Sequence, residues 1–445
     1  MYRTLAKAVC CLIALVLAVS YVPPCQASAP LPHYQIVADL DYASASLVTT
    51  ETVNYTNDTR SALDSIVFNV TPAHFDSFTL FDCKVNGKPA TANIEGAVLE
   101  VALETPLLPR QSVLVDLEFE VDVPQQDDRL GSGGSILALG NWFPILSVFR
   151  TPRLTGSDQP AGWDRSPYTA MGDPFYSQAA NFQVRINTSD PVAIAHTGEL
   201  VEKQENSWIF KADKVRDFAM AISTRYESTS QLVDGVEITA YYLPEHATAG
   251  AQYLDIAVRT VQWLNEAVGS YPYPSLHVAE IYSSGQVIGQ EYPNLVFIGS
   301  SVSALTGGID SYLSYVISHE VAHQWFYAII GNDQFFDPWL DESLATWSAY
   351  HFVRVQRPDL FPGLWQYQVK GPLEEAIRIY GSTPVNTSML DFSRSGHYVA
   401  IVYRRGAVFI EEMYHLMGND DFFSALQQYF SAFKFQVYLL SIDDS

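Results

Sequence analysis

The chain has few cysteines and few basic residues for its 445 residues. Three of its four cysteines, Cys10, Cys11 and Cys25, lie near the N-terminus, so only Cys83 remains beyond residue 27. This excludes a mature fold held together by internal disulfides. Lysine and arginine number 25 against 49 aspartates and glutamates, which gives a formal net charge of −24. This balance favours solubility and argues against a general affinity for nucleic acid.

Long apolar runs are also absent beyond the N-terminal segment, which has the layout of a secretory signal peptide. A basic start is followed by the apolar stretch 8–22 and two prolines. We expect cleavage after Ala27, because a cut two residues later would leave Pro30 just beyond it. An uncleaved anchor and lipidation of Cys25 are the alternatives, but the apolar stretch is short for a bilayer span of about 20 residues. The sequence therefore predicts an exported protein of bacterial type, with no stable membrane span in the mature chain.

The hydrophobic pattern divides the remaining chain into two parts. From 28 to 226, apolar and polar residues alternate in short runs such as 113–121, the period of strands with one wet face. We predict an all-β domain there. From 227 to 445 we predict an α+β domain dominated by helices in its second half. The expected strand pair covers 277–282 and 295–298, and the expected helices cover 251–268, 309–330, 338–355, 372–380, 402–417 and 422–433.

A metal-binding pattern lies inside the expected helix 309–330, where the sequence reads His319-Glu320-Val321-Ala322-His323. Residues four apart on a helix lie one turn above each other, so both imidazoles can reach one ion. Glu320 projects from the same turn and could take a proton from a metal-bound water. Taken alone, so short a pattern can also arise by chance in a structural helix.

A third ligand comes from the next expected helix, for which Asp337-Pro338 supplies a start with Asp337 as N-cap. Glu342 lies among apolar neighbours on this helix, where an unpaired carboxylate would be costly and a metal would satisfy it. Two histidines and one glutamate leave a fourth position open, which is typical of catalytic zinc. We predict one Zn²⁺ per chain on His319, His323 and Glu342, with Glu320 activating the water.

The sequence resembles the M1 family of metallopeptidases, the aminopeptidase N-like gluzincins. The family's glutamate ligand stands in a Trp-Leu-Asn-Glu-Gly context, and residues 339–343 read Trp-Leu-Asp-Glu-Ser. The segment 289–293, Gly-Gln-Glu-Tyr-Pro, is similar to the family's Gly-x-Met-Glu-Asn motif and its bacterial Met-Glu-Tyr-Pro variant. The segment 402–407 resembles the family's Tyr-x-Lys-Gly segment. The resemblance implies a thermolysin-like catalytic domain behind the β domain and an aminopeptidase acting on peptides with a free N-terminus.

The resemblance also implies roles for individual residues. Glu291 would bind the substrate's α-ammonium, and Gly289 and Gln290 would lie along the substrate backbone. Tyr403 would donate a hydrogen bond to the oxyanion of the tetrahedral intermediate, with Tyr398 as the alternative donor.

Several positions depart from the family pattern. Gln290 and Tyr292 replace the family's methionine and asparagine, which puts the shape of the specificity pocket in question. Arg405 replaces its lysine, which keeps the charge but not the geometry. Many relatives take a second amine-binding residue from the β domain; the segment 132–144 has no clear equivalent, and Asn141 is a candidate for it. Relatives continue into further helices, so we expect that this chain, ending at Ser445, is a truncated product or lacks part of the cleft's roof.

Three other functions stay open on this evidence. They are an endopeptidase on the same scaffold, an epoxide hydrolase like that of one branch of the family, and an inactive relative that serves as a binding protein. The intact metal ligands, Glu320 and Tyr403 speak against the last of these.

Overall fold

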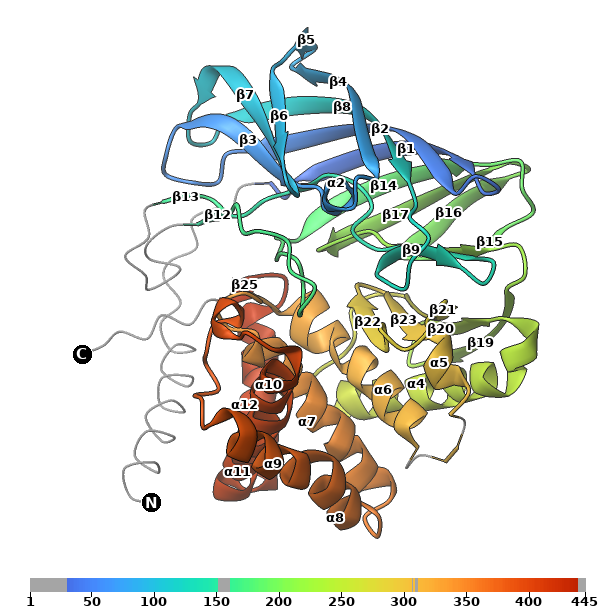
Figure 1. Cartoon of the computed structure of the whole chain (residues 1–445), viewed down its shortest axis with the longest axis vertical. Coiled ribbons are helices and arrows are strands. Elements are labelled where there is room, and N and C mark those ends of the chain that lie inside the picture. The colour runs from blue at the N-terminus through green and yellow to red at the C-terminus, as the bar shows by residue number, and fades with distance from the viewer. Residues whose placement is uncertain (1–29, 151–160, 306, 309–310, 439–445) are drawn as a thin grey trace.

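The computed structural model describes residues 30–150, 161–305, 307–308 and 311–438 of the chain. The expected signal peptide, 1–27, lies outside these residues. Figure 1 shows a β-sheet domain stacked on a mixed domain in which a small sheet is followed by a group of helices. The predicted order, an all-β domain followed by an α+β domain, is therefore confirmed.

The β domain is built on an eight-stranded sheet in the order β16-β17-β14-β1-β2-β8-β4-β5. In the central strand β1 every second side chain is buried, as the period-two alternation predicted. Every pairing in the sheet is antiparallel except that of β1 with β14. The strands are β1 (His33–Asp41), β2 (Ser46–Thr56), β4 (Phe78–Val85), β5 (Lys88–Pro89), β8 (Ser112–Asp122), β14 (Ala180–Asn187), β16 (Glu199–Gln204) and β17 (Ser207–Val215).

Smaller sheets complete this domain. One has the order β11-β3-β7-β6 and another β15-β18-β10-β9, and β12 pairs with β13. Their bounds are β3 (Leu63–Asn69), β6 (Ala92–Glu95), β7 (Val98–Leu107), β9 (Leu130–Gly133), β10 (Ile136–Leu139), β11 (Ile145–Leu146), β12 (Phe149–Arg150), β13 (Gly162–Trp163), β15 (Ala193–His196) and β18 (Met220–Ser223), with a one-turn helix α2 (Thr71–His74) between β3 and β4.

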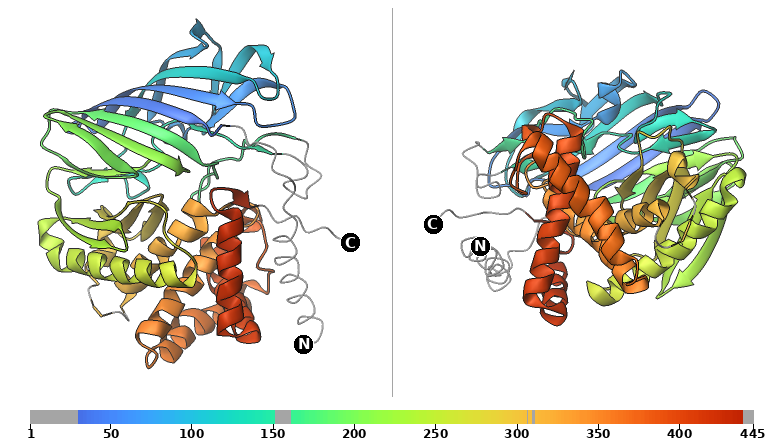
Figure 2. Two further views of the ribbon diagram at one scale, coloured as in Figure 1. Left: turned by 180° about the vertical axis from the view of Figure 1, so that it is seen from behind. Right: turned by 60° about the horizontal axis from the view of Figure 1, so that its bottom comes forward.

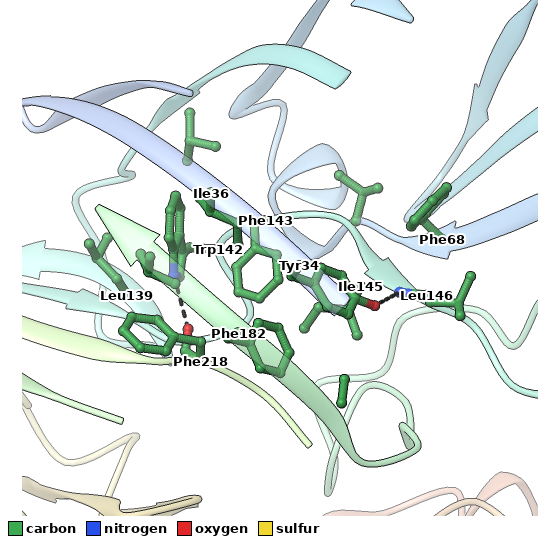
Figure 3. Packing of buried hydrophobic residues seen from close by; sticks show 14 of the residues in the cluster. Tyr34, Ile36, Phe68, Leu139, Trp142, Phe143, Ile145, Leu146, Phe182 and Phe218 are labelled. Atoms are coloured by element: carbon green, nitrogen blue, oxygen red, sulfur yellow. Dashed lines mark hydrogen bonds between the residues drawn. The ribbon is translucent and has the colours of Figure 1, made fainter. Parts of the chain in front are cut away.

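Aromatic side chains fill the core between these sheets (Figure 3). The rings of Tyr34 and Phe182 stack with centroids 4.5 Å apart. Two of the large side chains in this core have a paired polar group: the indole of Trp142 donates to the carbonyl of Phe218 at 3.1 Å, and the Tyr34 hydroxyl accepts from the Leu146 amide at 3.0 Å. These hydrogen bonds reduce the cost of burying the polar ends of the two side chains.

The second domain opens with a five-stranded sheet in the order β19-β20-β21-β23-β22. The expected strand pair corresponds to β21 and β23, which lie side by side in parallel, and β22 is the antiparallel edge strand beyond them. The motif 289–293 thus lies at the free edge of the sheet. The elements are β19 (Glu227–Val233), β20 (Val236–Tyr242), η1 (Pro244–His246), α4 (Ala247–Ala267), β21 (Ser275–Ile281), β22 (Gly289–Tyr292) and β23 (Leu295–Gly299).

Helices form the rest of this domain, with α12 running along the side that Figure 2 shows from behind. The expected helix 309–330 is α6 followed by a π-helical turn, and the expected helix 402–417 begins earlier, because α10, η5 and α11 run on without a break. The elements are α5 (Ser300–Ser303), α6 (Tyr312–Ala322), η2 (Gln324–Ile329), β24 (Gly331–Asn332), α7 (Trp339–Gln356), α8 (Phe361–Leu364), η3 (Trp365–Lys370), α9 (Gly371–Tyr380), η4 (Met389–Asp391), α10 (Ser395–Tyr398), η5 (Val399–Arg405), α11 (Gly406–Met417), α12 (Asn419–Phe433) and β25 (Val437–Tyr438).

The start of helix α7 differs from the prediction. Asp337 is not its N-cap: the helix begins at Trp339, and no side chain caps it. Pro338 already has helical dihedrals, φ −60° and ψ −20°, and the main-chain carbonyl of Asp337 accepts from the Leu340 amide at 3.1 Å. The fixed φ of proline therefore sets the helix start without help from the neighbouring carboxylate.

The two domains share buried surface. Alanines of the β15-β18-β10-β9 sheet pack against β21, β23 and Tyr292 of the second domain. Arg216, fully buried at the end of β17, donates to the carbonyls of Ser177, Tyr327 and Gln436 and so links both domains. Among the described residues, no helix has the length and apolar character needed to cross a membrane.

Candidate active site

A cleft of about 740 Å³ runs between the two domains. One wall comes from the β domain, in the segments 127–129 and 168–173. The other comes from β22 and from helices α6, α7 and η5. Most of the residues that the sequence singled out line this cleft, whereas Asn141 and Tyr398 do not; those that line it are Glu291, Gly289, Gln290, His319, Glu320, His323, Glu342 and Tyr403.

Three candidate metal ligands meet at the floor of the cleft. The Nε2 atoms of His319 and His323 are 3.1 Å apart, and Oε2 of Glu342 lies 3.3 Å from the first and 3.4 Å from the second. Ligand atoms bound to a tetrahedral zinc at about 2.0–2.1 Å are about 3.3–3.4 Å from each other. The three atoms therefore already have the spacing of three corners of a zinc tetrahedron, and the donor set fits the predicted ion.

A neighbouring carboxylate orients one ligand. Nδ1 of His323 lies 2.5 Å from Oδ1 of Asp341, to which it donates, so its Nε2 lone pair is left for a metal. Burial alone would raise the pKa of Glu342, but the imidazoles of His319 and His323 outweigh it and lower the pKa. Glu342 is thus held as a carboxylate, the form that binds metal.

Glu320 stands beside this triad and is 6% exposed. Burial, opposed by the charge on His323 and reinforced by Glu342 and Asp341, raises its pKa to about 8. Its place beside the three ligands suits the role predicted for it, that of a general base close to the metal. Its carboxylate packs against Gly289, where an added Cβ would lie only 2.2 Å from Oε1.

Glu291 lies on the His323 side of the triad. Ligand atoms of Glu291, His323 and Asp341 all fall within 4.8 Å of one another. Burial raises the pKa of Glu291 and the charge of Asp173 adds to the rise, so a cation bound here would relieve both effects. A separate cavity of about 10 Å³ adjoins Glu291. The buried side chains of Arg129, Asn141 and Tyr292 surround this cavity and close the cleft at this end.

The β domain closes that end with a charged network that the sequence did not predict. Arg129 pairs with Asp173 at 3.0 Å and donates to Asn141 at 3.3 Å. Asn141 in turn donates to the buried Asp217 at 2.5 Å. Asn141, the candidate for a second amine-binding residue, is thus occupied behind the cleft, whereas Asp173 lines it. The sequence signal for this wall is limited to the three adjacent charged residues 127–129.

Asp127, also from the β domain, holds the loop that leads into β22. Its carboxylate accepts from the amides of Ser284, Gln286 and Val287, at 2.6, 3.0 and 3.2 Å, and from the Ser284 hydroxyl at 2.9 Å. These donors lower the pKa of Asp127 against the effect of burial. The approach to the motif 289–293 is thereby fixed by the other domain.

Tyr403 and not Tyr398 faces the triad. The hydroxyl of Tyr403 donates to Oε1 of Glu342, and its ring stacks on His319 with centroids 5.8 Å apart. Tyr398 packs in the core shared with the β domain. Burial raises the pKa of Tyr403, so its phenol remains a hydrogen-bond donor. The π-helical turn η5 brings it there.

Close packing holds η5 against α7. The Ser343 hydroxyl, next to the ligand Glu342, donates to the carbonyl of Val402 at 2.6 Å. A Cβ at Gly406 would lie 1.7 Å from that hydroxyl, so only glycine allows this approach. The contact explains why a glycine follows Tyr403 at this spacing.

Comparison with known sequences agrees with this geometry. Residues 253–440 match the peptidase family M1 domain. Aminopeptidase N of Lactobacillus helveticus is 23% identical over 407 residues, which cover 82% of this chain and 47% of that protein. The alanine/arginine aminopeptidase of Saccharomyces cerevisiae is 22% identical over 209 residues, which cover 45% of this chain and 24% of that protein. The chain thus spans less than half the length of these relatives.

Solved structures share the fold. The M1 zinc metallopeptidase of Deinococcus radiodurans superimposes with a TM-score of 0.63 at 17% identity, covering 93% of this chain and 88% of that one. A variant of that enzyme bound to a Tyr-Ser-Ala substrate gives a TM-score of 0.61 at 18% identity, with coverage of 93% and 88%. Both described domains therefore have their counterparts in one two-domain architecture.

Proposed function

We propose that this chain, which belongs to peptidase family M1, is a zinc-dependent aminopeptidase that removes residues from the free N-terminus of peptides. The observation that carries the proposal is the position of Glu291. Its carboxylate lies next to the metal triad at the closed end of the cleft, with only about 10 Å³ of space behind it. A peptide whose first carbonyl reaches the triad has no room to extend further in that direction, and its ammonium meets a carboxylate.

His319, His323 and Glu342 would hold the zinc ion, one per chain. Bound there, zinc would supply Lewis acidity that polarises the peptide carbonyl and lowers the pKa of water. Glu320 takes a proton from the attacking water and returns it to the departing amine. Tyr403 donates to the carbonyl oxygen as negative charge develops on it, once its phenol turns from Glu342.

Peptides with a free N-terminus test the proposal. The zinc-loaded chain is expected to hydrolyse Ala-Ala-Ala and to leave N-acetyl-Ala-Ala-Ala intact. Removal of zinc by a chelator abolishes hydrolysis, and added zinc restores it. Equal cleavage of the free and acetylated peptides would assign the chain to the endopeptidases. A chain without tightly held zinc and without activity after zinc is added would be an inactive binding relative.

The role of Glu291 is tested separately. Glu291→Gln is expected to lower kcat/KM for the free peptide by about 100-fold, because a charge-assisted contact to the ammonium is lost. Glu266→Gln, on the exposed face of α4, is the matched control. A variant at Glu291 that still discriminates fully between free and acetylated peptides would move amine recognition to Asp173. We also propose that the enzyme is exported, which secretion of a tagged full-length chain would test.

A further inference from the structure

A second arginine lines the cleft at the end opposite Glu291. Arg404 directly follows Tyr403 on η5, and its side chain is half-buried in the cleft wall beside Gln368 and Tyr350. Its Nε donates to the carbonyl of Gln368 at 3.2 Å. No other hydrogen bond or ion pair of this guanidinium is found among the described residues. Most of its five donors therefore have no partner among the described residues.

The neighbouring arginines are occupied. Arg129, the other arginine of the cleft wall, is paired with Asp173 at the closed end. Arg405 turns away from the cleft and donates to the Ser382 hydroxyl at 2.9 Å and to the carbonyl of Thr383 at 2.5 Å. Within the described cleft wall, Arg404 is thus the arginine without an acidic partner, in a chain whose net charge is −24.

The direction of a bound peptide follows from the order of groups along the cleft. Glu291 lies on the His323 side of the triad. On the other side the ring of Tyr315 lies 5.7 Å from that of His319 and 4.8 Å from that of Tyr350. A peptide held by its ammonium at Glu291 therefore passes the metal and leaves over Tyr315 and Tyr350.

Arg404 lies on this exit path. Burial raises the pKa of the phenols of Tyr312 and Tyr350, and the positive charge of Arg404 opposes the rise at both, which places the guanidinium near them. Tyr312 precedes His319 by seven positions on α6, about 10 Å along the helix axis. An extended peptide advances about 3.3–3.6 Å per residue, so a carboxylate two residues beyond the scissile carbonyl lies about 7 Å from it.

We propose that Arg404 binds a carboxylate in the departing part of the peptide, and that this carboxylate is the C-terminus of a tripeptide. The direction of the peptide in this inference rests on the proposed function. A guanidinium pairs with a carboxylate in bidentate fashion, and a substrate carboxylate would supply the acidic partner that the fold does not. The enzyme would then select short peptides by binding both the N-terminal ammonium and the C-terminal carboxylate.

The test compares peptides that differ only in this carboxylate, with the zinc-loaded full chain. The kcat/KM for Ala-Ala-Ala is expected to exceed that for Ala-Ala-Ala amide by about 10- to 100-fold, the size of a hydrogen-bonded charge pair. In Arg404→Gln this ratio is expected to fall to near one, and in Arg404→Glu below one. Arg405→Gln, the neighbour turned away from the cleft, is the control and keeps the ratio of the parent. Because the ratio is taken within one sample, a partly unfolded variant does not distort it.

Two further arms identify the source of the carboxylate and its reach. Ala-Ala-Glu amide should have a higher kcat/KM than Ala-Ala-Ala amide only if an acidic side chain can pair with Arg404. If only the C-terminal carboxylate can do so, the two amides should have equal kcat/KM. Alanine pentapeptide as the free acid should lose the advantage, because its carboxylate extends beyond Arg404. Equal kcat/KM for acid and amide in the parent, or a preference that survives in Arg404→Gln, would overturn the inference.

Equilibrium binding separates this inference from the proposed function. In calorimetry, the zinc-loaded Glu320→Gln variant should bind Ala-Ala-Ala about 10- to 100-fold more tightly than its amide. In the double variant that carries both Glu320→Gln and Arg404→Gln, this difference should vanish. If the parent hydrolyses none of the peptides, the proposed function fails, and the binding difference alone then decides on Arg404. If hydrolysis occurs but both peptides bind equally, only the inference about Arg404 fails.

Discussion

Replacing Gly289 with alanine is expected to disable the general base while leaving the fold and the metal site intact. The new Cβ would lie 2.2 Å from Oε1 and 2.5 Å from Cδ of Glu320. The backbone of Gly289 is not left-handed, so alanine adds no dihedral strain. The atoms that it meets belong to the end of a flexible side chain, which can move at little cost in stability.

The size of the effect follows from that contact. Carbon and oxygen atoms pack at about 3.3 Å, so the carboxylate of Glu320 must retreat by about 1 Å. A misplacement of this size at a reacting group lowers the rate about 100-fold, equivalent to about 2.7 kcal/mol in the barrier. His319, His323 and Glu342 are not touched by the added methyl group, so zinc content should stay at one per chain. We therefore expect a fall in kcat with KM and the melting temperature nearly unchanged.

Steady-state kinetics, metal analysis and thermal unfolding of Gly289→Ala together test this reasoning. Gly363→Ala is the control, because its Cβ would meet nothing within 4 Å and its backbone is not left-handed. In a double-mutant cycle, Gly289→Ala should add little to Glu320→Ala, because the side chain that the methyl group displaces is already absent. A rise in KM with kcat unchanged would mean that Gly289 serves the substrate backbone and not Glu320. Loss of zinc would refute the reasoning as well.

Two other substitutions test separate parts of the structure. Tyr403→Phe is expected to lower kcat by 100-fold or more with little change in KM, because its hydrogen bond to the carbonyl oxygen strengthens in the transition state; unchanged kcat would move the donor to Tyr398. Glu51 lies on the buried face of β2 and is 1% exposed. Neither of its carboxylate oxygens has a hydrogen-bond partner in the described part of the chain, and burial raises its pKa well above the ordinary value of 4.5. As pH rises, Glu51 loses its proton in the unfolded chain before it does so in the folded chain, so the free energy of unfolding decreases above about pH 4.5. Glu51→Gln should therefore stabilise the fold at pH 7 by about 1 kcal/mol or more, with no gain at pH 4. Urea unfolding at the two pH values checks this, and an equal gain at both would contradict it.

The sequence was sufficient for the parts of the site that lie within one helical turn or one short motif. The spacing of His319 and His323 requires only a helix to bring them together, and α6 provides it. The alternating pattern likewise predicted the β domain, because a sheet with one buried face needs period two. Glu342 could be named because a carboxylate among apolar neighbours needs a partner.

The parts that the sequence did not reveal depend on tertiary contacts. Asp173 and Arg129 are far from the motifs in the chain and reach the cleft only because the β domain packs on the second domain. The family resemblance favoured Tyr403 over Tyr398, but the face that each presents depends on the π-helical turn η5, which no local pattern signals. Arg404 is one of two adjacent arginines, and only the fold shows which one faces the cleft.

The hydrogen bonds of Asp127 have a consequence for how such a protein can be divided or recombined. The strand that carries Glu291 belongs to one domain by sequence but is held in place by a carboxylate of the other. A catalytic domain transplanted without its own β domain would keep its candidate metal ligands, which lie on α6, at its C-cap and on α7, and would lose the restraint on the loop that leads to Glu291. On the proposed function, binding of the ion would then be inherited with one domain, and recognition of the chain end only with the matched pair.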